Sequence, residues 1–221
     1  MTTAQERADL AHVRWIGGGT GSGKTTVAQR LAERYDVLVY DGDAAERRYV
    51  AQASADKQPR LSGLLRMTVR QRWLQRTPQQ IFNEMPSMNG ETFPLILGDL
   101  RTWPVTRPVL VDDFRVLPKD VAALLANRDH AVFLLPIPEF RADNLYRRYA
   151  DPAHARATWG DLTPAEVLPA RLERDRLWDD EIRRQANRHG LPIIITDGNR
   201  SIDQVADQIA YLFRLEPAAA E

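Results

Sequence analysis

The residues of this sequence best suited to chemistry lie at positions 18–25. They read Gly-Gly-Thr-Gly-Ser-Gly-Lys-Thr, which matches the phosphate-binding pattern G-x-x-x-x-G-K-T. Glycines allow the backbone to take positive φ values and to approach a ligand, so that successive N–H groups point at one anion. Lys24 would bring a charge to the β- and γ-phosphates, and the Thr25 hydroxyl would ligate Mg²⁺. The motif therefore predicts a site for a nucleoside triphosphate, taken as ATP, with Mg²⁺.

The segments on both sides of this loop fit the strand–loop–helix context that the motif requires. The apolar run at 13–16 predicts a buried strand, and Val27, Leu31 and Tyr35 recur at the spacing of one helical face. We therefore expect the loop and the first turn of the helix to bind the nucleotide. The predicted residues are Gly18, Gly19, Thr20, Gly21, Ser22, Gly23, Lys24, Thr25 and Thr26.

Asp112 directly follows the apolar run 109–111, which predicts another buried strand. A carboxylate at a strand tip beside a phosphate loop matches the Walker-B pattern, in which it holds Mg²⁺ directly or through water. We therefore predict that Thr25 and Asp112 bind the metal. Asp113 is the alternative metal residue, in which case Asp112 would be structural.

Asp41 and Asp43 flank a glycine directly after the apolar run 37–40. A carboxylate at this strand end could face the γ-phosphate, accept a proton from an attacking hydroxyl group and help to seat Mg²⁺. The structural alternative is an Asx turn that caps the next helix. We favour the catalytic interpretation, with Asp43 or Asp41 in that role.

Composition excludes several classes of protein. The 30 basic and 30 acidic residues balance, which argues against a broad nucleic-acid surface, and the absence of cysteine excludes disulfides and thiol catalysis. The first residues are polar, and no apolar run approaches the length of a membrane span. We expect a cytoplasmic protein with no membrane association, and a homodimer stays open.

Five short apolar runs alternate with helical patterns along one predicted domain, residues 1–221. This alternation predicts an α/β sandwich around a parallel sheet, with its ligand at the carboxyl ends of the strands. Residues 58–107 interrupt the alternation and predict a helical insertion, in which Leu65, Val69 and Trp73 share one helical face. The runs are 13–16, 37–40, 108–113, 131–135 and 192–196.

Together, the loop, Asp41-Gly42-Asp43, Asp112, an Arg-rich segment and Asp197-Gly198 after the last strand resemble the P-loop small-molecule kinases. This nucleoside/nucleotide-kinase-like group includes gluconate, shikimate, adenylylsulfate and chloramphenicol kinases, and the Asp-Gly-Asp sequence is most similar to that of gluconate and adenylylsulfate kinases. The resemblance covers the core strands, about half of the chain, and does not cover 58–107, where such enzymes choose their acceptor.

The resemblance implies a three-layer P-loop NTPase fold with strand order 2-3-1-4-5 and a lid at 139–165. It also implies that Asp43 or Asp41 takes the base position and that Gly198 lies in a loop at the edge of the adenine. Lid arginines would close over ATP and stabilise the transferring phosphoryl group. The candidates are Arg141, Arg147, Arg148 and Arg156, with Arg147 and Arg148 favoured.

The function expected from these features is transfer of the γ-phosphoryl group of ATP to a hydroxyl of a small molecule. A nucleoside monophosphate kinase needs no base, and its anionic acceptor would be repelled by Asp-Gly-Asp. A regulatory nucleotide-binding NTPase needs a water-positioning Gln or Glu, and no Gln lies beside the strand that ends at Asp112. If several arginines of the insertion and the preceding helix face the crevice, the acceptor is anionic. They are Arg47, Arg48, Arg66, Arg70 and Arg72.

Overall fold

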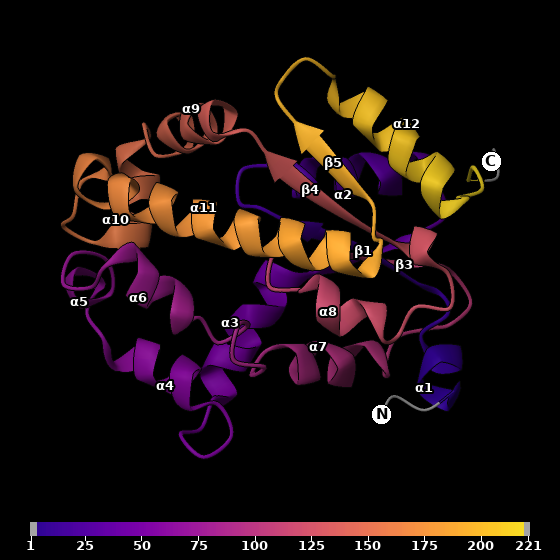
Figure 1. Ribbon diagram of the computed structural model, residues 1–221, viewed down its shortest axis with the longest axis horizontal. Helices are drawn as coiled ribbons and strands as arrows, with labels where there is room; N and C mark the ends of the chain where they lie inside the picture. Colours follow the sequence, from indigo (N-terminus) through magenta and orange to yellow (C-terminus); the bar gives the residue numbers. More distant parts are fainter. Residues whose placement is uncertain (1–3, 219–221) are drawn as a thin grey trace.

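A computed structural model describes residues 4–218, and its centre is a five-stranded parallel sheet (Figure 1). The strand order is β2-β3-β1-β4-β5, which confirms the order that the resemblance implied. The strands are β1 (Val13–Gly18), β2 (Leu38–Asp41), β3 (Val109–Asp112), β4 (Ala131–Pro136) and β5 (Ile193–Thr196).

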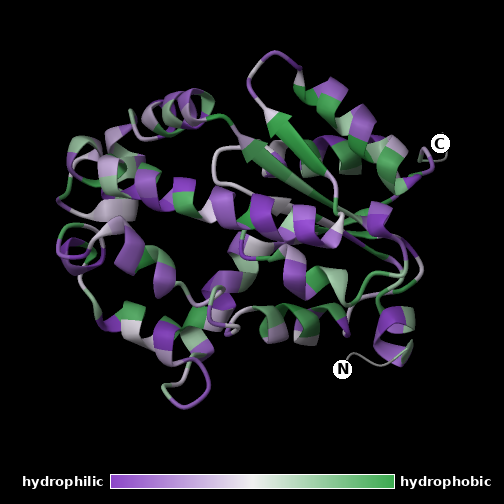
Figure 2. Ribbon diagram, viewed as in Figure 1, coloured by the Kyte–Doolittle hydropathy of each residue, from purple (hydrophilic) through white to green (hydrophobic). Residues whose placement is uncertain are grey.

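The central strands are mainly apolar on both faces because helices cover both sides of the sheet, with Arg14 of β1 an exception. β3 and β4 are buried along their whole length, as expected for a parallel sheet enclosed between two helical layers. Figure 2 shows the visible strands as the most continuously hydrophobic part of the ribbon, while the surrounding helices alternate between hydrophilic and hydrophobic residues.

Two groups of helices complete the three-layer sandwich that the sequence predicted. α2 (Lys24–Arg34) and α12 (Ile202–Phe213) pack on one face of the sheet, where Leu31 and Phe213 meet Leu110 and Val132. The other face is covered by α3 (Gly42–Gln52), α7 (Phe93–Leu100), α8 (Pro118–Ala122) and the long α11 (Pro164–His189). The short α1 (Ala4–Asp9) and the 3₁₀ turn η1 (Arg128–His130) lie at the other end of the strands from the phosphate loop.

The insertion at 58–107 is helical, as predicted, but its helices are short. They are α4 (Pro59–Arg66), α5 (Val69–Trp73), α6 (Pro78–Asn83) and α7. The single helical face expected for Leu65, Val69 and Trp73 is wrong, because the chain is extended at Met67 and Thr68. Thr68 begins a new helix with a capping box: its side chain accepts from the Gln71 N–H, and the Gln71 side chain accepts from the Thr68 N–H.

Residues 138–159, in the region of the predicted lid, form two helices. α9 (Pro138–Arg148) and α10 (Pro152–Trp159) pack with the start of α11 in a small apolar cluster of their own. The rings of Tyr149 and Trp159 lie 3.9 Å apart in this cluster. Trp73 of α5 packs against the same cluster, so the predicted lid and the insertion are in contact.

Within residues 4–218, none of the helices combines the length and the apolar character needed to cross a membrane.

Replacing Phe213 by alanine should lower the free energy of unfolding by about 3–5 kcal/mol, because it removes a large ring from a packed interior. Tyr211→Ala is the matched control on the same helix. Tyr211 is 88% exposed, whereas Phe213 is 1% exposed, so the control should change stability by no more than about 0.5 kcal/mol. Urea unfolding followed by circular dichroism measures both, and equal losses would contradict the packing of α12 on the sheet.

Candidate phosphate-binding site

The glycine-rich loop joins β1 to α2 in a conformation that depends on glycine. Gly18, Gly21 and Gly23 have φ values of 117°, 76° and 86°, which side chains rarely allow. A Cβ atom on Gly18 would also lie 2.1 Å from the carbonyl oxygen of Leu134 on β4. The loop therefore curves tightly over the end of β4 and leads into the N-terminus of α2, the geometry that concentrates N–H groups on an anion.

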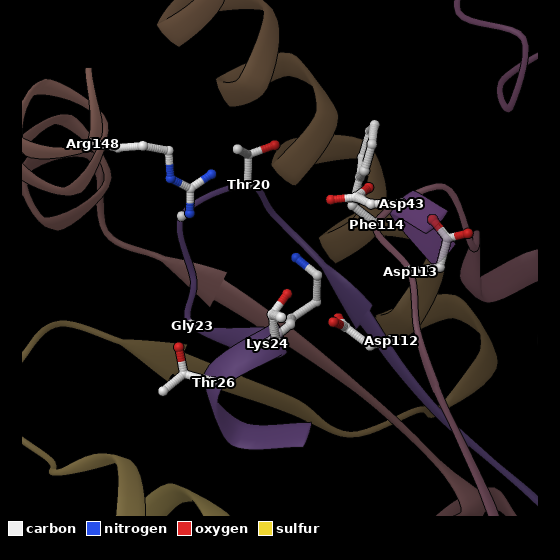
Figure 3. Close-up of a pocket in the computed structure, with 11 residues that line it drawn as sticks. Thr20, Gly23, Lys24, Thr26, Asp43, Asp112, Asp113, Phe114 and Arg148 are labelled. Carbon is white, nitrogen blue, oxygen red and sulfur yellow. The ribbon is translucent and has the colours of Figure 1, made fainter. Parts of the chain in front are cut away.

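Lys24 lies at the centre of the pocket above this loop. Its side chain points into the pocket, with Asp112 and Asp43 on one side and Arg148 on the other (Figure 3). The ammonium group donates a hydrogen bond of 2.7 Å to the carbonyl oxygen of Gly19. Burial lowers the pKa of Lys24, and nearby carboxylates, Asp112 first among them, oppose this effect. A phosphate oxygen would offer this buried charge a stronger partner than a carbonyl does.

Asp112 ends β3 beside the start of α2, as the Walker-B pattern predicts. It is buried, and its carboxylate accepts a hydrogen bond from the Thr25 hydroxyl group. Burial raises the pKa of Asp112. The charge of Lys24 and the hydrogen bond from Thr25 partly offset this rise. A hydroxyl and a carboxylate are the oxygen donors that Mg²⁺ prefers, so the residues fit the metal.

The metal would depend on the phosphates as much as on the protein. In the described chain, 4–218, no group of three or more His, Cys, Asp or Glu side chains forms a metal site. Mg²⁺ is commonly held by one or two protein oxygens together with substrate phosphates and water, and Thr25 and Asp112 match that number.

Asp113 lines the same pocket as Asp112, but its carboxylate already has a cationic partner. Its carboxylate accepts hydrogen bonds from the Arg115 backbone N–H (2.8 Å) and from the Arg115 guanidinium (2.6 Å). A Cβ atom on Gly42 would lie 2.4 Å from Asp113, so this carboxylate is packed under the start of α3. The geometry favours Asp112 over Asp113 as the metal residue.

The two carboxylates of the Asp-Gly-Asp sequence separate into different environments. Asp41 is the N-cap of α3, and its side chain accepts a 2.9 Å hydrogen bond from the Ala44 N–H. Asp43 lies in the first turn of α3 and lines the pocket. Its side chain is 75% exposed and accepts a 2.9 Å hydrogen bond from Arg115. Asp41 thus caps the helix, as the alternative interpretation of this sequence predicted. Asp43 faces the predicted position of the γ-phosphate.

Arg115 is a residue of this site that the sequence analysis missed. Its side chain is 4% exposed and pairs with three carboxylates: Asp113, Asp43 and Glu46. These partners raise its pKa against the effect of burial. Its position three residues after Asp112, at a strand end already rich in carboxylates, is a signal that could have identified it.

The four predicted lid arginines occupy four different environments. Arg148 of α9 lines the pocket opposite Asp43 (Figure 3). Arg141 is buried, donates a 3.2 Å hydrogen bond to the Thr20 carbonyl oxygen and pairs with Asp179. Arg147 is exposed and donates to the Asn144 side chain (2.6 Å). Arg156 lies on α10 at another hollow, so of the two favoured arginines, Arg148 alone lines the pocket.

Helix α11 contacts the glycine-rich loop through residues that belong to no recognisable sequence motif. The Trp178 indole N–H donates to the Gly18 carbonyl oxygen (3.3 Å). Asp179 is buried beside Gly19, and a Cβ atom on that glycine would lie 2.4 Å from its carboxylate. Burial raises the pKa of Asp179 to about 6, although the charge of Arg141 opposes the shift.

A small apolar hollow lies behind the loop, at the place expected for the base of the nucleotide. Gly198 follows β5 with φ 84°, and a Cβ atom there would lie 3.2 Å from the Phe140 ring. An apolar slot beside a phosphate site suits a flat heterocycle. Its lining residues are Ser22, Gly23, Val27, Phe140, Ile195, Thr196, Asp197, Gly198, Arg200, Ile202 and Val205.

Comparison with known proteins adds little to this geometry. No protein-family model matches the chain, and no curated protein matches it. Among solved structures it is similar to the crystal structure of an uncharacterized protein from Eubacterium ventriosum ATCC 27560, with 14% identity and a TM-score of 0.42. That match covers 91% of this chain and 97% of the other. At this level of similarity the match carries no functional argument.

Gly19→Ala should weaken ATP binding by about tenfold or more, because the new methyl group would displace the Asp179–Arg141 pair that supports the loop. Gly98→Ala, in α7, is the control, since a Cβ atom there meets nothing within 4 Å. Titration calorimetry with ATP and Mg²⁺ measures both affinities. Equal affinity in the two variants would contradict the contact between the loop and α11.

Asp179→Asn should make the slope of stability against pH more positive between pH 4 and 6. Folded Asp179, with its raised pKa of about 6, binds a proton more tightly than an unfolded aspartate, whose pKa is about 3.9. Its ionisation therefore lowers stability as the pH rises through this window, by about 1.4 kcal/mol per unit of pKa difference. Urea unfolding at several pH values measures the slope, and identical slopes in the two proteins would contradict the assignment.

Proposed function

We propose that this protein transfers the γ-phosphoryl group of ATP to a hydroxyl group of a small molecule, and that it belongs among the P-loop small-molecule kinases. The observation that carries the proposal is one pocket at the carboxyl edge of the sheet. It is lined by the glycine loop, Lys24, the carboxylates of Asp112 and Asp43, and Arg148. Phosphoryl transfer needs positioning and balanced charge more than covalent chemistry, and this pocket offers both.

Each side chain has a defined part in the proposed reaction. The acceptor oxygen forms a bond to the γ-phosphorus as the bond from that phosphorus to the bridging oxygen of ADP breaks. The hydroxyl proton passes to the carboxylate of Asp43, which Arg115 holds in place. Lys24 and Arg148 balance the negative charge of the transferring group and of the departing ADP.

Thr25 and Asp112 would hold Mg²⁺, which supplies neutralisation of charge on the β- and γ-phosphate oxygens when it is bound. The apolar hollow beside Gly198 would take the adenine, and the N–H groups of the loop would bind the phosphates.

Asp43→Asn should reduce phosphoryl transfer at least about a hundredfold, the usual contribution of a general base. Asp41→Asn is a matched control two residues away. Asparagine also caps helices well, so this variant should keep activity within about threefold. The measurement is transfer of labelled γ-phosphate from ATP and Mg²⁺ into pools of sugars, polyols, nucleosides and other hydroxylated compounds, with Lys24→Ala as the inactive reference.

The pools also separate the alternatives. Label that enters only nucleoside monophosphates would replace the proposal by a monophosphate kinase. Label released only as inorganic phosphate, at the same rate with every pool, would favour a regulatory NTPase. An Asp43→Asn variant with the activity of the wild type would remove Asp43 from the mechanism.

A further inference from the structure

Helix α9 contacts the glycine-rich loop with two side chains that both donate to loop carbonyl groups. The Arg141 Nε–H donates a 3.2 Å hydrogen bond to the carbonyl oxygen of Thr20. The Asn144 side-chain amide donates a 3.0 Å hydrogen bond to the carbonyl oxygen of Gly21. Residues three and four apart lie on one face of a helix, so Arg148, which lines the phosphate-binding pocket (Figure 3), shares this face. One face of α9 therefore serves both the loop and the pocket.

These two bonds orient the peptide planes that begin at Thr20 and Gly21. The peptide bonds of the loop are trans, and in a trans peptide the carbonyl group of one residue and the N–H group of the next point in opposite directions. With both carbonyl groups held toward α9, the N–H groups of Gly21 and Ser22 point away from that helix. Within residues 4–218, neither N–H group has a hydrogen-bond partner. They are two oriented donors in the loop, as a binding site for an anion requires.

The orientation of the Asn144 amide group follows from the chemistry of its two partners. A carbonyl oxygen can only accept, so the NH₂ end of the amide faces Gly21. A guanidinium can only donate, so the oxygen end faces Arg147, whose Nη2 atom lies 2.6 Å away. Arg147 does not line the pocket, but its hydrogen bond keeps the donor end of Asn144 on the loop.

The two carbonyl groups that precede this part of the loop are held in other ways. That of Gly18 accepts from Trp178, and the other end of the same peptide plane is fixed because the Gly19 N–H donates to the Leu134 carbonyl oxygen (2.8 Å). The Gly19 carbonyl accepts from Lys24, the side chain that the proposed function assigns to the phosphates. Lys24 would leave this carbonyl for a phosphate oxygen, whereas the donors from α9 and α11 can stay in place when a nucleotide binds.

We propose that Asn144 is a positioning residue of the phosphate site: its amide group, oriented by Arg147, holds the Gly21 carbonyl group so that the Ser22 N–H group donates to a phosphate oxygen. The inference rests on the proposed function for the identity of the ligand, the polyphosphate chain of ATP. Donors whose direction is fixed in advance bind an anion without the cost of ordering the loop. Asn144 is not among the residues that line the pocket, so it acts through the loop backbone.

Asn144 offers a cleaner test than Arg141, which also pairs with the buried carboxylate of Asp179. Asn144 is half-buried and uncharged, so Asn144→Leu removes the donor at similar size and leaves the charge around the phosphates unchanged. Asn144→Gln keeps an amide donor and should recover part of the loss. Asn187→Leu is the matched control, because it makes the same exchange at an exposed position of α11.

The probes are tripolyphosphate and adenosine, each titrated into the folded protein while the backbone amide signals are followed by NMR spectroscopy. Asn144→Leu should bind tripolyphosphate about threefold to tenfold more weakly than the wild type, the effect of losing one neutral hydrogen bond. Adenosine has no phosphate and should bind both proteins equally. Tripolyphosphate should shift the Ser22 amide proton downfield in the wild type and in Asn187→Leu, and this shift should be smaller in Asn144→Leu.

The outcomes distinguish this inference from the proposed function. Equal affinity of the wild type and Asn144→Leu for tripolyphosphate would overturn the inference and leave the proposed function standing. Equal losses of affinity for tripolyphosphate and for adenosine would also overturn it, because the substitution would then disturb the fold as a whole. A wild-type protein that binds neither ATP nor tripolyphosphate would contradict the proposed function itself, and Asn144 would then have no phosphate site to position.

Discussion

A buried ammonium group at the carboxyl edge of the sheet controls the arrangement of charges around it. Lys24 is 7% exposed, and carboxylates surround it, with the charge of Asp112 opposing its desolvation most strongly and that of Asp179 next. Buried charges are tolerated when they are paired and hydrogen-bonded. The carboxylates in turn have cationic partners of their own, because Arg115 pairs with Asp113 and Asp43 while Arg141 pairs with Asp179. The site is thus a network in which one further anion finds a buried cation already in place.

This network joins parts of the chain that are distant in sequence. Asp43 comes from α3, Asp112 and Arg115 from the end of β3, and Asp179 from α11, all packed around the loop after β1. A parallel sheet makes this convergence possible, since the carboxyl ends of its strands meet at one edge. At this edge Phe114 lines the phosphate-binding pocket and also a second hollow on the side of the helical insertion.

The features that sequence could predict are those that depend on local patterns. The loop, the strands and the position of Asp112 at a strand end each follow from residue types over a few positions, and the structure has them where they were expected. Asp41 and Asp43 could not be distinguished from sequence, because both flank the same glycine. Their roles separate only because Asp41 precedes the first turn of α3 and caps it.

The features that sequence could not predict depend on tertiary packing. Trp178 and Asp179 lie about 160 residues after the loop they support, and nothing in α11 itself indicates that contact. Arg147 and Arg148 are neighbours in sequence, and the rotation of α9 decides which of them lines the pocket. The arginines near the insertion could likewise not be placed from sequence: Arg48 pairs with Asp99, the Nε atom of Arg72 is buried without a hydrogen-bond partner, and the others are exposed, namely Arg47, Arg66 and Arg70.

The measurement that tests the central claim most directly is calorimetric titration of ATP with and without Mg²⁺, in the wild type, Asp112→Asn and Lys24→Met. We expect the wild type to bind ATP and Mg²⁺ to tighten this binding. Asp112→Asn should lose the contribution of Mg²⁺ and keep binding of free ATP, whereas Lys24→Met should lose at least about tenfold in both conditions. ATP binding that is the same in all three proteins, or absent from the wild type, would contradict the assignment of this loop as a triphosphate site.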